Sequence, residues 1–555
     1  MFELLGSAAM VIAWLVPDHY LPWLSAYNDS VMALALILLL LGLVKREASQ
    51  ASVPAIFWIT VAVAGIPWLH WVTGRLAFSG DAVVGSLYVL ALAIAILVGH
   101  GWARRDPTGS AALLAGTILL GGSLSAVIAL FQGLRVGDLG LWSLGLCTGG
   151  RACANLAQPN NLGTLLGLGV LGLLLLREQR RLGRGVSAAV LALLLLGAAT
   201  TQSRTAMLFG PAILIGLFVA RRRGVQFQIQ LRTVFAVTVI HWLLSYGWPV
   251  LQTALLLDTT ASLSARSLDA GRLQAWVMFI DALSQSPWTG VGWMQTASAQ
   301  LAVAENHPPL RLVWQHAHNL FLELMLWCGY PLGLALTLLI VTWYLNRAKR
   351  VDSIEAVVGL LSVTLFGIHS MLELPYHYAY FLIPIGLWIG HVEHACGSGI
   401  RRFAAWRWLP AAAAAVMVLG IWRDYPKIEE EARRVRFENL RIGLTTAAQP
   451  TPDAPFLSGL TAFLEFTRTK PSEGMTVADL KAMENVVKRY PYAGSIAKLS
   501  WAWALNGRLP EAIEMFKKIR YVHGDVLYHR IRNDMHQRVV DGQIGLRALD
   551  DAVQD

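Results

Sequence analysis

"RLVWQHAHNLFLELMLWCGYPLG", residues 311–333, joins a polar segment to an apolar run that is long enough to begin a membrane span. Two histidines and an asparagine, His316, His318 and Asn319, stand where the apolar run begins. Asn319 is placed to cap the helix that follows, because its side-chain oxygen can accept hydrogen bonds from the first helical N–H groups. The histidines allow another interpretation, a reactive centre for a substrate that lies partly in the lipid.

The whole chain has the composition of a polytopic membrane protein. Its 555 residues are 55% hydrophobic and 14% charged, with a mean hydropathy of +0.51, whereas a soluble globular protein carries about 25% charged residues. The net charge of +10 is concentrated in short basic clusters between apolar runs. Such clusters set membrane topology, which weakens a nucleic-acid interpretation. No cleavage motif cleanly follows the first apolar stretch, so we expect that span to be retained.

The apolar runs predict an all-α protein with about thirteen membrane-spanning helices, each needing roughly 20 apolar residues. The basic clusters fall in alternate loops, and the positive-inside rule assigns these loops to the cytoplasm. The N-terminus is then inside and the C-terminal tail outside. The spans are expected near residues 3–17, 30–44, 52–71, 81–100, 111–131, 160–176, 186–201, 205–220, 232–248, 318–345, 353–372, 377–395 and 405–422.

This topology places several polar segments on the outer face, including a large loop at about 249–317. Cys147 and Cys153 share an outer loop, where an oxidising compartment favours a short disulfide; two free thiols are the alternative. The tail contains "AKLSWAWALNGRLPEAIEMFKKI", residues 497–519, which predicts a helix–turn–helix unit of the tetratricopeptide (TPR) kind. We therefore expect a transmembrane domain over 1–422 and a small outer helical domain over 423–555.

Two arginines on the outer face are candidate binding residues. Arg204 lies in the tight turn "TQSRTAM", and Arg272 lies near the start of the amphipathic stretch "DAGRLQAW". The structural alternatives are a snorkelling anchor for Arg204 and a solvated helix face for Arg272. Because a guanidinium grips diphosphate oxygens with a planar fork of donors, the pair favours an anionic, lipid-linked substrate.

"LAQPNNLGTLL", residues 156–166, presents side-chain amides before an apolar span. We expect Asn160 or Asn161 to cap that helix. Gln158 precedes Pro159, which favours an extended backbone there. The Gln158 amide is therefore held at the membrane surface, where it can bind a sugar or a phosphate.

The two histidines of the opening segment are poorly spaced for a shared metal. Residues two apart point to nearly opposite faces of a helix, and no nearby Asp, Glu or Cys cluster is expected to complete a site, so metal binding is disfavoured. One histidine can instead act as a general base on an acceptor hydroxyl. His369 and Glu373 are four residues apart, and we expect them to form a buried pair.

Six segments occur in a fixed order: "AQPNNLGT", "SRTA", "GRLQAW", "PWTGVGW", "HAHNLFLELMLWCGYPLG" and "HSMLELPYHYAYFL". Together they resemble the bacterial O-antigen ligase superfamily, and most closely its PglL-type protein O-oligosaccharyltransferases. The likeness covers roughly residues 30–420, and the tail resembles the C-terminal region of the same branch. Members are GT-C-like integral membrane glycosyltransferases that move a glycan from undecaprenyl diphosphate to a hydroxyl on the periplasmic face, without a metal or a nucleotide sugar.

The resemblance implies a role for each matching residue. It makes His318 the catalytic histidine, with His316 as its neighbour. The other implied site residues are Arg204 and Arg272, which bind the diphosphate, Gln158, and a tyrosine after "ELP", placed at Tyr378 with Tyr376 and Tyr380 as alternatives. Asn160 and Asn161 complete the predicted substrate-binding set.

The expected activity is transfer of a glycan to Ser or Thr of a periplasmic, pilin-like protein, by direct displacement with inversion at the anomeric carbon. The expected location is the bacterial inner membrane, with the active site facing the periplasm. Three alternatives remain: an O-antigen ligase that acts on lipid A-core, an O-antigen polymerase, and a transporter of lipid-linked glycans. The tail and the "QPNN" motif favour the protein acceptor.

Overall fold

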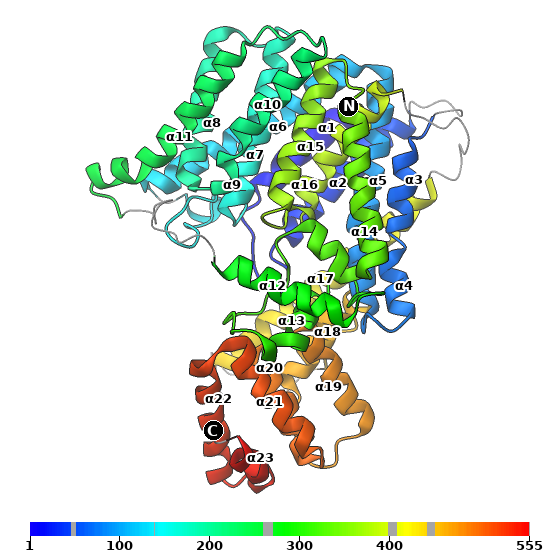
Figure 1. Cartoon of the computed structure of the whole chain (residues 1–555), viewed down its shortest axis with the longest axis vertical. Helices are drawn as coiled ribbons and strands as arrows, with labels where there is room; N and C mark the ends of the chain where they lie inside the picture. Colours follow the sequence, from blue (N-terminus) through cyan, green and yellow to red (C-terminus); the bar gives the residue numbers. More distant parts are fainter. Residues whose placement is uncertain (46–51, 138, 259–269, 398–407, 441–449, 554–555) are drawn as a thin grey trace. The chain divides into compact units, whose positions relative to one another are not determined.

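The computed structural model describes residues 1–45, 52–137, 139–258, 270–397, 408–440 and 450–553, and these fold into α-helices without a β-strand (Figure 1). The chain divides into two compact units. The first comprises Met1–Ala64, Leu87–Leu268 and Ile340–Val418, and the second comprises Gly65–Ser86, Asp269–Leu339 and Leu419–Asp555.

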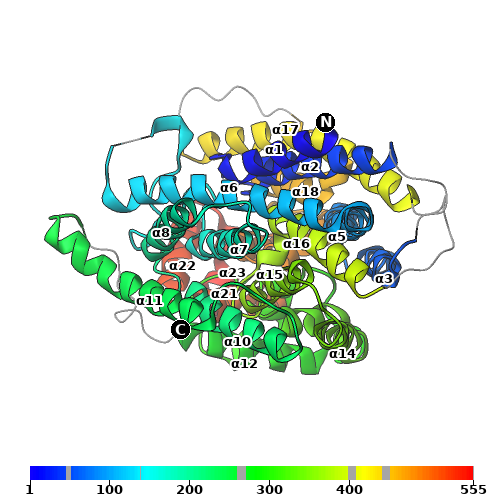
Figure 2. The same cartoon turned by 90° about the horizontal axis from the view of Figure 1, so that it is seen from above.

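The first unit contains most of the apolar helices. They are α1 (Phe2–Leu15), α2 (Ala26–Val44), α3 (Ala55–Val63), α6 (Pro107–Leu134), α7 (Pro159–Glu178), α8 (Arg184–Thr201), α9 (Arg204–Met207), α10 (Phe209–Arg222), α11 (Leu231–Ala254), α15 (Ile354–Ser370) and α16 (Ala379–Ala395). Within it, α7 packs against α6, α8 and α15 (Figure 2).

The second unit consists of shorter helices. They are α4 (Ile66–Val72), α12 (Ala270–Gln285), α13 (Thr296–Val303), α18 (Ser458–Arg468), α19 (Val477–Arg489), α20 (Ala493–Leu505), α21 (Leu509–His523), α22 (Asp525–Val540) and α23 (Arg547–Ala552). Three long helices contribute residues to both units: α5 (Ser79–Arg105), α14 (Leu320–Ala348) and α17 (Leu409–Leu440).

The helices confirm a polytopic membrane protein. Nine helical segments in the described part of the chain are long and apolar enough to cross a membrane, and α1 and α15 are shorter apolar helices. Every predicted span overlaps one or two helices, and positions 405–407 of the last span lie outside the described residues. The count of thirteen spans stays a prediction.

Helices α5 and α16 cross with their backbones in contact. Gly386 and Gly390 of α16 face α5, and a Cβ added to Gly390 would overlap the Ile96 carbonyl oxygen. Gly99 of α5 lies against the Leu387 carbonyl in the same way. Small residues four apart allow this approach, which membrane helices use because van der Waals packing is a main source of their association.

A buried ion pair joins α16 to α14. The Glu393 carboxylate is fully buried, and Arg347 donates to it through Nε (2.5 Å) and Nη2 (3.0 Å). The Trp343 indole also donates to Glu393 Oε1, at 2.7 Å. An acidic side chain is tolerated inside an apolar helix when its charge is paired and its oxygens are satisfied.

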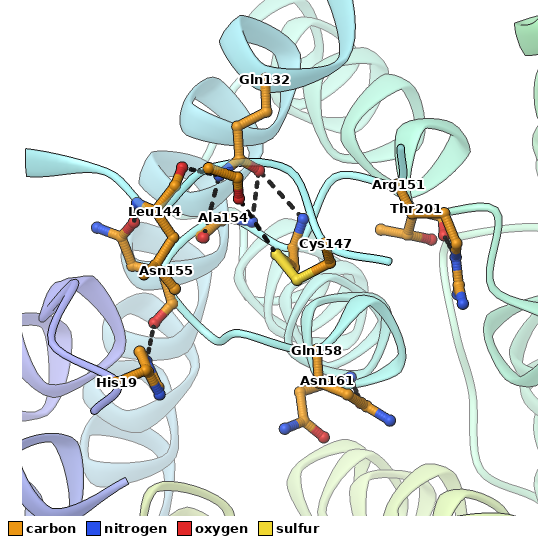
Figure 3. The surroundings of a disulfide bond; sticks show 12 residues. His19, Gln132, Leu144, Cys147, Arg151, Ala154, Asn155, Gln158, Asn161 and Thr201 are labelled. Carbon is orange, nitrogen blue, oxygen red and sulfur yellow. Dashed lines mark hydrogen bonds between the residues drawn. A yellow bond between two sulfur atoms is a disulfide. The ribbon is translucent and has the colours of Figure 1, made fainter. Parts of the chain in front are cut away.

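A disulfide joins Cys147 to Cys153 in the loop between α6 and α7, as the sequence predicts (Figure 3). Gln132 of α6 supports this loop, because its Oε1 accepts from the N–H groups of Cys153 (3.1 Å) and Ala154 (2.8 Å). The loop is therefore held both covalently and by a buried side chain.

The residue after Ala154 ties the same loop to the N-terminal helices. Asn155 donates through Nδ2 to the Leu15 carbonyl at 2.8 Å. His19 Nε2 donates to the Asn155 carbonyl at 2.9 Å (Figure 3). Burial lowers the pKa of His19, so its neutral form is favoured at neutral pH.

The helix–turn–helix predicted in the tail is present. Helix α20 ends at Leu505, the break falls at Asn506 and Gly507, and α21 begins at Leu509. The apolar core of these helices also includes Leu301 of α13 and the adjacent Ala304, so part of the long loop packs with the tail. The proposed division into 1–422 and 423–555 stays a prediction.

The α5–α16 crossing should not tolerate a larger residue. We expect Gly390→Leu to lower the free energy of unfolding in detergent by about 1–3 kcal/mol, because the added side chain must displace backbone. Thermal unfolding of the full chain measures this. Gly367→Leu in α15 is the matched control, since a Cβ there meets none of the described atoms within 4 Å; equal losses in both variants would contradict the close crossing.

The disulfide should be detectable directly. Peptide mapping without reductant is expected to find Cys147 linked to Cys153, while Cys328 and Cys396 alkylate after denaturation. Replacing both linked cysteines by serine should lower stability by about 2 kcal/mol, the loop-closure entropy of so short a loop. Cys396→Ser is the control. Alkylation of Cys147 in unreduced protein would refute the linkage.

Candidate active site

The start of α7 contains three of the predicted site residues, and Gln158 is its cap. Gln158 Oε1 accepts from the Asn161 N–H at 2.8 Å. The prediction that Asn160 or Asn161 caps this helix is wrong. Proline fits the first helical position, so the helix begins at Pro159 and both asparagines lie inside its first turn.

Asn160 joins α7 to three other segments. Its Nδ2 donates to Glu373 Oε1 at 2.9 Å, and its Oδ1 accepts from Ser203 Oγ at 2.7 Å. Arg151, inside the disulfide loop, approaches the same Oδ1 at 3.4 Å and donates through Nε to the Thr201 carbonyl at 2.8 Å. One amide thus connects the disulfide loop, the turn before α9 and the segment after α15.

A second contact ties α7 to α15. Thr164 Oγ1 and His369 Nδ1 are 2.8 Å apart, and both residues are fully buried. His369 and Glu373 are both buried, as predicted, and each binds a side chain of α7. The predicted pairing between them stays a prediction.

Arg204 is the first residue of α9 and is half-buried. The residue before it caps this short helix, because Ser203 Oγ accepts from the Ala206 N–H at 3.2 Å. The same hydroxyl donates to Asn160, so Ser203 links the start of α9, where Arg204 lies, to the start of α7.

Of the three tyrosines, Tyr378 and Tyr380 stack at the start of α16, with ring centroids 4.9 Å apart. Tyr380 is fully buried, and its hydroxyl accepts from Asn161 Nδ2 at 2.9 Å. Tyr378 is half-buried beside it. Asp29 of α2 supports this turn by accepting from the Ala379 N–H at 2.8 Å. The sequence analysis missed Asp29, although an acidic residue inside a span is itself a signal.

In the second unit, Asn319 caps α14, as predicted. Its Oδ1 accepts from the N–H groups of Phe321 and Leu322, each at 3.1 Å. His318, immediately before it, has a backbone φ of +52° and is half-buried. Its ring meets Trp314 edge-on, with centroids 5.0 Å apart. The reactive histidine of the sequence prediction therefore lies directly outside the first turn of α14.

Glu323, which the sequence analysis missed, lies beside the histidines. Its carboxylate is fully buried and is 3.4 Å from His316 Nδ1. This carboxylate was not predicted beside the histidines, because Glu323 is seven residues after His316 and is brought next to it by the first turn of α14. A glutamate inside the apolar run "LFLELMLW" was the available signal.

Arg272 lies on α12, four residues before Trp276, so the two side chains share a face of that helix. The Trp276 indole donates to the Ala317 carbonyl at 2.8 Å. The face of α12 that carries Arg272 is therefore the face turned to the segment "HAH", and Arg272 is half-buried there.

The predicted site residues are thus divided between the two compact units. Gln158, Asn160, Asn161, Arg204 and Tyr378 belong to the first unit. Arg272, His316 and His318 belong to the second.

An apolar cavity of about 280 Å³ lies between α7, α8, α10 and α11. It begins at Gly163 and Ala206, close in sequence to Asn160 and Arg204, and extends along α7 to Arg177. Its other lining residues are almost all aliphatic or small. This space suits a hydrocarbon chain.

Comparison with known proteins gives consistent results. Residues 188–337 match the O-antigen ligase family, and residues 356–536 match the C-terminal region of virulence-factor membrane-bound polymerases. The general O-oligosaccharyltransferase of Acinetobacter baylyi is 29% identical over 78% of this chain and 77% of that protein. A ComP-specific O-oligosaccharyltransferase of the same organism is 26% identical over 69% of each chain.

The two family matches contain several of the predicted site residues, but not those at the start of α7. Arg204, Arg272 and His318 lie in the first matched region, and Glu373 and Tyr378 lie in the second. Two regions of the chain therefore match an O-antigen ligase and a membrane-bound polymerase family, and the chain is a glycosyltransferase-type enzyme similar to O-oligosaccharyltransferases.

Proposed function

We propose that this enzyme transfers an oligosaccharide en bloc from undecaprenyl diphosphate to a Ser or Thr hydroxyl of a periplasmic, pilin-like protein. Two relatives with O-oligosaccharyltransferase activity in their names support this reaction. The observation that carries it is the segment "HAHN", where a half-buried histidine in an unusual backbone conformation directly precedes a capped, apolar helix. The proposed location is the inner membrane, with the reacting groups on the periplasmic side.

In the proposed reaction, His318 takes the proton of the acceptor hydroxyl as its oxygen attacks the anomeric carbon. The bond from that carbon to the diphosphate breaks, and its electron pair leaves with the diphosphate. Arg204 and Arg272 stabilise the negative charge that develops there. A single displacement inverts the anomeric carbon. The chemistry uses no metal and no nucleotide sugar.

The remaining site residues are assigned to substrate binding. Gln158, Asn160 and Asn161 act at the start of α7, Tyr378 acts beside them, and His316 acts next to the base. The cavity between α7, α8, α10 and α11 is proposed to take part of the polyprenyl chain, since its apolar lining matches that chain in polarity. Thirteen spans and a TPR-like outer domain over 423–555 complete the proposed architecture.

A second candidate is transfer to a glycan acceptor, because the matched families include ligases and polymerases. An O-antigen ligase would use lipid A-core, and a polymerase would use another lipid-linked glycan. The acceptor therefore distinguishes the two candidates.

Loss of the base should stop transfer. We expect His318→Ala to reduce glycosylation by about 100-fold or more, the usual contribution of a general base, and Arg272→Ala to have a similar effect through the leaving group. The measurement is the intact mass of a pilin-like acceptor co-expressed with a lipid-linked glycan pathway. His316→Ala is the matched control and should retain more activity.

Two outcomes would contradict the proposal. Full transfer activity in a well-folded His318→Ala variant would show that His318 is not the base. Glycan found only on lipid A-core would move the assignment to ligase.

Filling the cavity should affect long-chain donors selectively. Val237 lines the cavity. We expect Val237→Trp to raise the KM for an undecaprenyl donor about tenfold, because displacing two methylenes of the lipid chain from the cavity costs about 0.8 kcal/mol each. A short-chain polyprenyl donor should be unaffected. Leu243→Trp, at an exposed position of the same helix outside the lining, is the control; equal effects on both donors would exclude the cavity as the chain site.

A further inference from the structure

Glu323 binds the loop that carries the predicted base. Its Oε1 accepts from the Ala317 N–H at 3.2 Å and from Thr296 Oγ1 at 3.0 Å, and it lies 3.4 Å from His316 Nδ1. A fully buried carboxylate is costly unless hydrogen bonds compensate for its lost hydration. These contacts provide that compensation. Two of them are to Ala317 and His316 in the segment before α14, and the third is to Thr296 of α13.

The position of this carboxylate is itself fixed. The Trp327 indole donates to Thr296 Oγ1 at 3.0 Å, and the Thr296 hydroxyl in turn donates to Glu323. Thr296 is the first residue of α13 and is fully buried. Capping of α14 does not explain Glu323, because Asn319 already performs that function.

The peptide groups on either side of Ala317 are consequently held at two points. The Ala317 N–H donates to Glu323, and its carbonyl accepts from Trp276. The next residue, His318, has the left-handed φ of +52°. For a residue other than glycine this conformation costs about 1 kcal/mol, and it persists when surrounding contacts fix it.

We propose that Glu323 is a positioning residue for His318. Its carboxylate fixes the Ala317 peptide and the His316 ring, and this sets the direction in which the His318 side chain leaves the loop. Glu323 acts through the loop and does not touch the substrate. The inference rests on the proposed function, because it assumes that His318 is the base.

Three substitutions test this role in the full chain. Glu323→Leu keeps the approximate volume but removes both acceptor oxygens. Glu323→Gln keeps one acceptor oxygen for the Ala317 N–H. Glu393→Leu is the matched control, since Glu393 is also a fully buried glutamate but pairs with Arg347 on other helices.

The readouts are kcat and KM per folded protein, and hydrogen exchange of the amides at 316–319. We expect Glu323→Leu to lower kcat on the order of 100-fold, the effect of a catalytic group displaced by about 1 Å, with donor KM within about twofold. Exchange at Ala317 should accelerate. Glu323→Gln should recover most of kcat and protection, and Glu393→Leu should change neither once corrected for folded fraction.

Wild-type kcat in Glu323→Leu, or a loss matched by Glu393→Leu, would overturn the proposal. So would equal loss in Glu323→Gln and Glu323→Leu with unchanged exchange, because the charge and not the position would then matter. If the wild-type chain transfers no glycan to protein, the proposed function is wrong. Hydrogen exchange at the Ala317 amide would still test whether Glu323 holds this peptide group.

Discussion

The hydrocarbon interior of a membrane leaves no water for backbone polar groups, so each helix that crosses it must satisfy its own N–H and C=O groups. Only the ends of the helices escape this rule. Much of the polar chemistry in the described part of the chain is accordingly found where helices begin: at α7, α9, α14 and α16. At each of these starts a side-chain oxygen accepts from a backbone N–H: Gln158, Ser203, Asn319 and Asp29.

Except for Arg272 on α12, the candidate site residues lie at or beside these four starts. Ser203 binds Asn160 and caps the helix that begins with Arg204, Asn319 follows His318, and Asp29 accepts from the N–H of Ala379, which lies between the two stacked tyrosines. The side chains that close the helices therefore also position the groups that would act on a substrate. In a membrane protein, where few polar residues are available, the same polar side chain can both cap a helix and hold a neighbouring residue in place.

Much of this arrangement follows from the sequence, because it depends on local features. Apolar run length predicts the spans, loop position predicts the Cys147–Cys153 linkage, and a polar residue before an apolar run predicts the Asn319 cap. The contacts that failed prediction depend on where a helix begins or on packing between separate segments. Asp29 reaches Ala379 across 350 positions, and the cap of α7 depends on where Pro159 starts the helix. Glu323 meets Ala317 and His316 through the first turn of α14, and it meets Thr296 only because α13 lies beside α14.

The disulfide loop has a consequence for the order of assembly. Arg151 inside it reaches Asn160 on α7 and the carbonyl that ends α8, so this corner is complete only after the chain has been synthesised and inserted through α8. If the loop faces the periplasm, as proposed, oxidation follows export. A copy of the chain that failed to insert would keep Cys147 and Cys153 reduced. The disulfide would then distinguish chains whose loop has reached the periplasm from chains whose loop has not.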